Sequence, residues 1–225
     1  MKMSSFQEKS RSDYRENQRL FNEINKHLME DEKPSVYLEA LHRSSVLQKT
    51  AFAVLEELSR TPQSARHHPE GDVWRHTLMV VDQAAQHKGR SSDPQAFMWA
   101  ALLHDIGKPA TTEWAGGKCR AYDHDKVGAK LAKEVLTAGG LALPPGFIES
   151  VKSLVRFHMH ILYVVKDMPY GDLAALKEQA DIDDVALLGL CDRLGRGGLD
   201  EKTKKQEEES VALFLRKCRT AKIKG

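Results

Sequence analysis

The sequence has few cysteines, no long apolar run and no excess of either charge. Three cysteines, widely separated and odd in number, exclude a disulfide framework and a paired-cysteine metal knuckle. No stretch approaches the length of a membrane-spanning helix, and the polar N-terminus does not resemble a signal peptide. Lysine and arginine (34) nearly balance aspartate and glutamate (32), which excludes a uniformly basic nucleic-acid-binding surface. These absences predict a cytoplasmic protein with no membrane partner.

The chain has enough apolar material to form a core. Hydrophobic residues make up 41% of its 225 residues, with only 8 prolines and 15 glycines, so it is not disordered, collagen-like or low in complexity. From Pro34 onward, apolar residues recur at helical spacing between the breaks GG, PPG, MPYG and GRGG. No segment shows the alternation of apolar and polar residues that is typical of a strand, and residues 113–123 are expected to form an irregular segment. We therefore predict an all-α fold, a bundle of seven to nine helices.

Charge patterning suggests three parts. Residues 1–33 carry seven basic and seven acidic residues among few apolar ones, which predicts a solvated helical or flexible lead-in outside the core. Residues 34–200 form the expected domain, with preceding helices at 34–63 and a metal-site core at 64–200. Residues 201–225 are predicted to form a C-terminal helix with a basic tail, and solvation of that tail is favoured over contact with RNA phosphates.

Histidines and aspartates end the apolar faces of five predicted helices. A buried carboxylate without a partner is costly, so two inward aspartates accompanied by four inward histidines call for a metal ion. Any one such histidine is more often an ordinary core residue, and only the combination indicates a metal site. If its helix ends early, His160 is the alternative to His158. The inward residues are His76, His104, Asp105, His124, His158 and Asp192.

The order His76, His104-Asp105 and Asp192 resembles the signature of the HD superfamily of metal-dependent phosphohydrolases, an all-α fold. Several segments are similar to the HD domain of bacterial tRNA nucleotidyltransferases, and the resemblance covers about residues 34–200. Those transferases carry an N-terminal catalytic head with a glycine-rich turn and paired carboxylates. No such pattern precedes residue 34, so we expect the hydrolase module alone. The segments are HHPEGDVWRHTLMVVDQA (67–84), ALLHDIGKP (101–109), HDKVGAKLA (124–132) and LCDRLGRG (190–197).

The resemblance implies a ligand set. One ion would be held by His76, His104, Asp105 and Asp192. Members of the superfamily with two further histidines bind a second ion, and His124 and His158 match the positions of those histidines. On this resemblance Asp105 would bridge the two ions, and we favour this dinuclear form over a mononuclear one. A mixed imidazole and carboxylate site suits Fe, Mn, Co, Ni or Zn, with Mg as a further candidate.

The predicted activity is phosphohydrolysis by metal-activated hydroxide. The substrate implied is a small-molecule nucleotide or phosphoester, with RNA as a further candidate, and the bond is a phosphomonoester or a 2′,3′-cyclic phosphodiester. A non-catalytic HD module that binds nucleotide or RNA is the alternative. Candidate catalytic residues are Asp105, Lys108 and Arg193, and candidate substrate-binding residues are Glu70, Lys108, Arg193 and Arg196.

The candidate substrate residues have plainer interpretations too. Lys108, Arg193 and Arg196 carry charges that are common on any surface, and Glu70 could belong to a capped turn rather than to the mouth of the site. Trp114 and Tyr122 are candidates for stacking a nucleobase, although exposed loop aromatics are common. Other aromatics in apolar runs, Trp74, Phe97, Trp99 and Phe157, are expected in the core.

Overall fold

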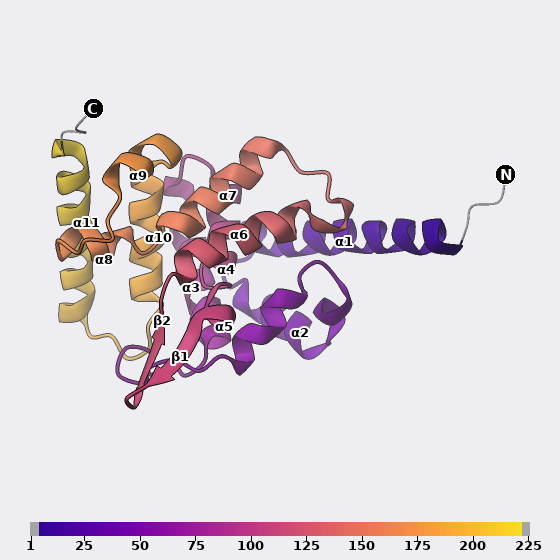
Figure 1. Cartoon of the computed structure of the whole chain (residues 1–225), viewed down its shortest axis with the longest axis horizontal. Coiled ribbons are helices and arrows are strands. Elements are labelled where there is room, and N and C mark those ends of the chain that lie inside the picture. The colour runs from indigo at the N-terminus through magenta and orange to yellow at the C-terminus, as the bar shows by residue number, and fades with distance from the viewer. Residues whose placement is uncertain (1–4, 222–225) are drawn as a thin grey trace.

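The computed structural model describes residues 5–221. Most of the segments with helical periodicity in the sequence form helices in it (Figure 1). The all-α class is confirmed, and the described residues form eleven α-helices rather than seven to nine because several are short. None of them is long and apolar enough to cross a membrane. The helices are α1 (Ser5–Glu30), α2 (Ser35–Arg43), α3 (Val73–His87), α4 (Pro94–Leu103), α5 (Lys108–Thr111), α6 (His124–Thr137), α7 (Pro145–Phe157), α8 (His160–Val165), α9 (Leu173–Gln179), α10 (Ile182–Leu194) and α11 (Glu201–Thr220). Short 3₁₀ segments cover Val46–Lys49, Ala53–Arg60, Lys88–Arg90 and Ala138–Gly140.

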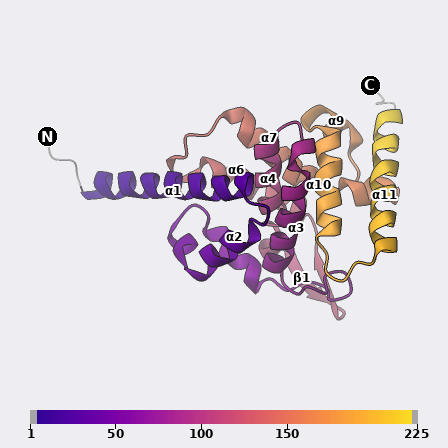
Figure 2. The ribbon, with the colours of Figure 1, turned by 180° about the vertical axis from the view of Figure 1, so that it is seen from behind.

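Helix α4 is the centre of the fold. Every residue from Ala96 to Leu103 is buried, as expected of a helix that is apolar on all sides. It contacts α1, α3, α7 and α10, while α6 packs on α7 and α11 lies beside α10 (Figure 2). The predicted core positions of Trp74, Phe97, Trp99 and Phe157 are confirmed. The ends of these helices meet on one side of α4, where the inward histidines lie.

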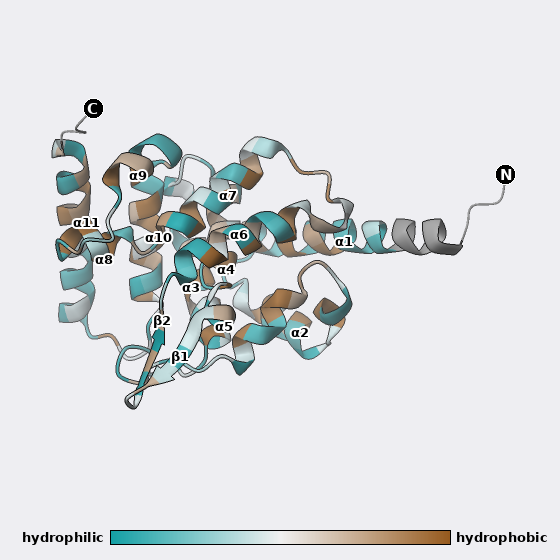
Figure 3. Cartoon of the chain, viewed as in Figure 1, coloured by the Kyte–Doolittle hydropathy of each residue, from teal (hydrophilic) through white to brown (hydrophobic). Residues whose placement is uncertain are grey.

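The N-terminal segment is not wholly a solvated lead-in. The second half of α1 places Leu20, Phe21, Ile24 and Leu28 in the core, and the Phe21 ring stacks on Trp99 at a centroid distance of 4.5 Å. Apolar residues accordingly gather on the part of α1 that lies against the body (Figure 3). The expectation failed because four apolar residues at helical spacing suffice to form a buried face, however charged the rest of the segment is.

Residues 112–121 form a β-hairpin instead of an irregular segment. Strand β1 (Thr112–Ala115) pairs antiparallel with β2 (Lys118–Ala121), with Trp114 opposite Cys119. Gly116 and Gly117, at φ values of 57° and 72°, supply the two-residue turn that such a hairpin needs. The two adjacent glycines were the sequence signal for this turn. The strands themselves are too short to show an alternation of apolar and polar residues. The hairpin projects from the helical body (Figure 1).

Candidate metal centre

The His104-Asp105 doublet lies in the turn that ends α4. His104 caps the helix, and the backbone turns back at once through a hydrogen bond from the Ile106 N–H to the Leu103 carbonyl. A Cβ atom at Gly107 would lie 2.1 Å from the backbone oxygen of His124. Glycine at this position therefore lets the doublet approach the start of α6, which carries the next histidine.

Asp105 presents one carboxylate oxygen to each of two histidine pairs. Its Oδ2 lies 3.2 Å from His104 Nε2 and 3.9 Å from His76 Nε2, and its Oδ1 lies 3.5 Å from His124 Nε2 and 3.8 Å from His158 Nε2. Asp192, from α10, reaches the first pair, with Oδ1 3.0 Å from His76 Nε2. Asp105 thus belongs to two groups of three possible ligand atoms, each group spanning at most 4.8 Å.

Hydrogen bonds fix the ring nitrogens that face the centre. The Nδ1 atoms of His104, His124 and His158 lie 2.7–2.8 Å from the backbone carbonyls three residues before them. A carbonyl only accepts, so each Nδ1 carries the proton and each Nε2 has a free lone pair. The Nε2 atoms of His124 and His158 lie 3.2 Å apart, although two lone pairs cannot bond each other. These converging acceptors fit a metal cation between them.

The charges agree with this donor set. Burial, followed by the imidazoles of His124 and His104, lowers the pKa of His158 to about 4, so its ring is neutral at pH 7. Burial alone would raise the pKa of Asp105, but the His104 imidazole and the Lys108 ammonium hold it well below its usual range. The pKa of Asp192 is held low against burial by His76 and Arg196. Two carboxylates therefore stay ionised in a buried site.

Glu70 stands behind His76 and not at the mouth of the site. Its side chain is only 4% exposed, and Oε1 lies 2.9 Å from Nδ1 of both His68 and His76. Its Oε2 accepts from the Gly197 N–H at 3.2 Å. Glu70 is therefore placed to orient His76, and it lies outside the set of described residues that line the cavity. His68 was missed in the sequence because it stands outside any helical pattern.

A cavity of about 620 Å³ opens onto the centre. Its wall includes Asp105, Asp192, His124 and His158 together with all three candidate cations, Lys108, Arg193 and Arg196. The Lys108 ammonium lies 2.6 Å from Asp105 Oδ2 and donates to Gln63 Oε1 at 2.7 Å. Arg193 forms an ion pair with Glu207 of α11, and Arg196 Nη2 lies 4.0 Å from Asp192 Oδ2. None of these three is an ordinary surface charge.

His158, not His160, reaches the centre. Helix α7 ends at Phe157, so His158 caps it and points towards Asp105. His160 begins α8 and is buried against Phe157 and Tyr163, and neither of its ring nitrogens has a hydrogen-bond partner among the described residues. The break between α7 and α8 therefore decides between the two histidines, a choice that the sequence left open.

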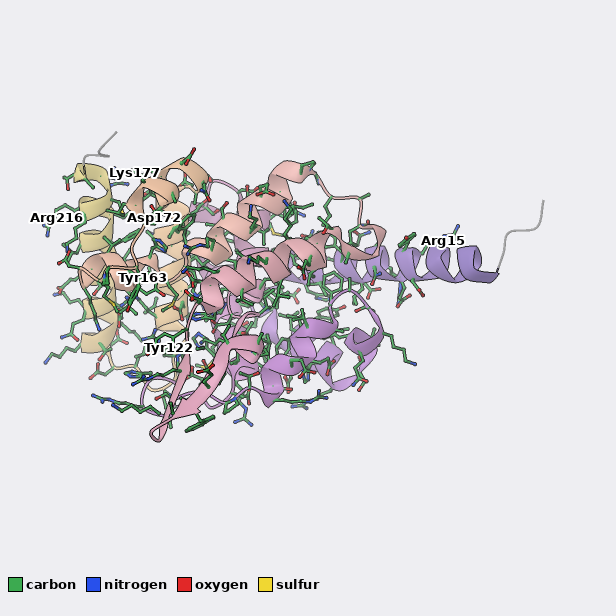
Figure 4. The ribbon with its side chains drawn as sticks, viewed as in Figure 1. Arg15, Tyr122, Tyr163, Asp172, Lys177 and Arg216 are labelled. Carbon is green, nitrogen blue, oxygen red and sulfur yellow. The ribbon has the colours of Figure 1, made fainter. Side chains whose placement is uncertain are left out.

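The exposed aromatic candidates lie on the hairpin. Trp114 is 63% and Tyr122 66% exposed. Tyr122 directly follows β2 and is separated from α6 by Asp123, and its position is seen in Figure 4. The Arg120 guanidinium carbon lies 5.9 Å from the centroid of its ring.

Comparison with known proteins places this arrangement in a family. The HD domain matches residues 73–197. A multifunctional CCA protein of Verminephrobacter eiseniae (strain EF01-2) is 33% identical over 202 residues, which cover 87% of this chain and 46% of that protein. Proteins of the same name from Pseudomonas syringae pv. syringae (strain B728a) and Pseudomonas fluorescens (strain SBW25) are 40% identical over 120 residues and 31% identical over 192 residues. These matches cover 52% and 82% of this chain, and 27% and 44% of the respective relatives.

The chain therefore spans less than half the length of these relatives. The HD match covers more than half of the chain and includes His76, the His104-Asp105 doublet, His124, His158 and Asp192. The similarity seen in the sequence is confirmed: this chain belongs to the HD domain family.

Proposed function

We propose that the chain is a metal-dependent phosphohydrolase with a dinuclear centre. The HD domain is a superfamily of metal-dependent phosphohydrolases, which supports the reaction class. The observation that carries the dinuclear form is the position of Asp105, whose two oxygens each face a different pair of histidine Nε2 atoms. In this arrangement Asp105 would contribute to both ion sites, with His76, His104 and Asp192 holding one ion and His124 and His158 the other.

The donor set suits Fe, Mn, Co, Ni or Zn better than Mg, because imidazole nitrogens dominate it. Two bound divalent ions supply Lewis-acid polarisation of a phosphoryl oxygen and activation of water near neutral pH. The chain's own contribution is to fix the histidine tautomers through backbone carbonyls and to hold both aspartates ionised. Glu70 performs the same task for His76 through its Nδ1 atom.

The cavity chemistry supports an anionic phosphoester substrate. Five lysine and arginine side chains line it against three aspartates and glutamates, and the ions would further offset the acidic groups. Lys108 is held beside Asp105 by Gln63, which places an ammonium where charge develops on a phosphoryl group. Arg193 and Arg196 lie at the end of α10 and can bind the same anion. The cationic lining therefore serves substrate binding and transition-state stabilisation.

We infer a nucleotide or an RNA end as the substrate, with a phosphomonoester or 2′,3′-cyclic phosphodiester as the bond. This inference draws on the relatives, which are named multifunctional CCA proteins. A cavity of about 620 Å³ lies within the range that small-molecule ligands occupy, so one nucleotide can enter it.

The test compares Asp105→Asn with wild-type protein purified without chelator. Elemental analysis is combined with assays on phosphomonoesters, 2′,3′-cyclic nucleotides and bis-p-nitrophenyl phosphate in Mn, Co, Ni, Fe and Mg. We expect about two transition-metal ions per wild-type chain with turnover, and loss of turnover by a factor of at least ~10³ in a folded Asp105→Asn variant. Turnover that survives the substitution would refute the proposal. Nucleotide binding without hydrolysis under every ion would instead support the binding-module alternative.

A further inference from the structure

The hairpin continues the wall of the cavity outward. Residues opposite each other in an antiparallel pair share a face, and faces alternate along each strand. Thr112, Trp114, Cys119 and Ala121 therefore lie on one face of the hairpin. Three of these four line the cavity, whereas only Arg120 does so from the opposite face, and the fourth is Trp114, directly across from Cys119. The indole thus stands on the cavity side of the hairpin, one strand step beyond the wall.

Trp114 differs from the other tryptophans of the chain. Its side chain is 63% exposed, whereas Trp74 and Trp99 are 3% and 0% exposed. The indole has no aromatic stacking partner among the described residues, while strand pairing on both sides of the glycine turn holds its backbone. A large flat apolar group, fixed in orientation and left in water beside a polar cavity, suits a ligand with a flat apolar face.

The surroundings of Trp114 carry positive charge. Lys118 and Arg120 lie on β2, on the face of the hairpin opposite to Trp114, and form no ion pair with any described residue. The Arg120 side chain nevertheless lines the cavity. Lys166 faces the cavity from the end of α8 and is exposed. Exposed aromatic rings interleaved with unpaired cations match a single-stranded nucleic acid, in which bases stack while phosphates are neutralised.

We propose that Trp114 stacks on the base next to the reacting phosphate, so that the substrate is the end of a single-stranded RNA and not a free mononucleotide. This proposal rests on the phosphohydrolase function given above. One nucleotide occupies the cavity with its phosphate at the metal centre, and the preceding base lies on the indole at the rim. Arg120 and Lys166, which line the cavity, contact the phosphates that continue along the strand. A mononucleotide has no second base and leaves Trp114 unused.

The kinetic test compares two phosphodiesters that share the same chemistry. One is a short oligoribonucleotide ending in a 2′,3′-cyclic phosphate, and the other is a 2′,3′-cyclic mononucleotide, which has no preceding base. In Trp114→Ala, the ratio of the KM for the oligonucleotide to the KM for the small diester should rise about tenfold over wild type. Trp114→Phe should restore most of it. Tyr170→Ala, which removes an aromatic of equal exposure (62%) from the loop between α8 and α9, should leave the ratio unchanged.

Fluorescence separates this inference from the proposed activity. Because Trp74 and Trp99 are buried, Trp114 supplies the emission that iodide can quench. An oligoribonucleotide with a free 3′-hydroxyl, which has no terminal phosphate to lose, should quench this emission and shield it from iodide. An oligomer of the same length with abasic sugars should do neither.

The outcomes distinguish the two proposals. If no phosphoester is hydrolysed but RNA still shields Trp114, the phosphohydrolase function fails and the base-stacking site stands. If hydrolysis is robust but Trp114→Ala leaves the KM ratio unchanged and RNA leaves the indole open to iodide, the stacking proposal is overturned and the phosphohydrolase function stands.

Discussion

Replacing His158 with leucine tests the dinuclear centre most directly. The substitution removes one imidazole and leaves a side chain that fits an apolar, buried position. The second ion would then keep only His124 and one oxygen of Asp105 as protein ligands, which is fewer than the three that catalytic metal sites retain. We therefore expect the metal content to fall from about two ions per chain to about one.

The magnitude follows from mass action. An ion at a free concentration 100 times its Kd stabilises the folded protein by about 2.7 kcal/mol. For a chain of this size, about 1 kcal/mol shifts the Tm by roughly 2–4 °C, so each ion should raise the Tm by roughly 5–10 °C. Saturating metal should raise the Tm of the wild-type protein by roughly 10–20 °C, and that of His158→Leu by about half as much.

The matched control is His160→Leu. This residue is as buried as His158 and lies only two positions later, but its ring nitrogens contact no described ligand or hydrogen-bond partner. Elemental analysis and scanning calorimetry of chelator-treated and reloaded protein give both readouts. Two ions retained by His158→Leu, or one ion lost from His160→Leu as well, would contradict the dinuclear assignment.

Three further substitutions or conditions test how the centre is supported. Glu70→Gln removes the carboxylate that orients His76, and competition with a chromophoric chelator should show metal affinity reduced by about 10- to 100-fold; an unchanged affinity would mean that Glu70 only caps its turn. Gly107→Ala sets a methyl group 2.1 Å from the His124 backbone oxygen. Denaturant unfolding should therefore show a free energy of unfolding lower by about 1–3 kcal/mol, and elemental analysis should show a loss of metal. A variant with unaltered stability and metal content would contradict the close approach of these two segments. The pKa of His158 is about 4 in the folded protein and 6.5 when unperturbed. Between pH 6.5 and pH 4, therefore, only the unfolded chain takes up a proton on this imidazole. The metal-free protein should consequently lose stability as the pH falls from about 6.5 to about 4. The lowered pKa of buried His160 acts in the same direction, and the raised pKa of His76 partly opposes it. Denaturant titrations in which stability rises on acidification would contradict this prediction.

The sequence was informative about part of the candidate metal centre because His76, His124 and Asp192 lie on regular helices. A residue three or four positions from a buried apolar residue shares its face, so the positions of His76, His124 and Asp192 follow from local spacing alone. The same spacing could not separate His158 from His160, since the answer depends on where α7 ends. At that end Phe157 and His160 are both buried, with their rings edge to face at a centroid distance of 4.8 Å.

Local spacing also determined the all-α class and, apart from the choice between His158 and His160, the inward set of aspartates and histidines, because helical periodicity and the cost of burying charge act on neighbouring residues. Tertiary structure alone decided that Asp105 lies between two histidine pairs, that Glu70 supports His76 and that Arg193 meets Glu207 of α11. The contacts of Asp105 join segments far apart in the chain, because they depend on how α3, α6 and α7 pack around the end of α4. Glu70 and His76 are only six residues apart and Arg193 and Glu207 fourteen, but the turn before α3 and the turn between α10 and α11 bring these side chains together, and no helical spacing encodes either turn.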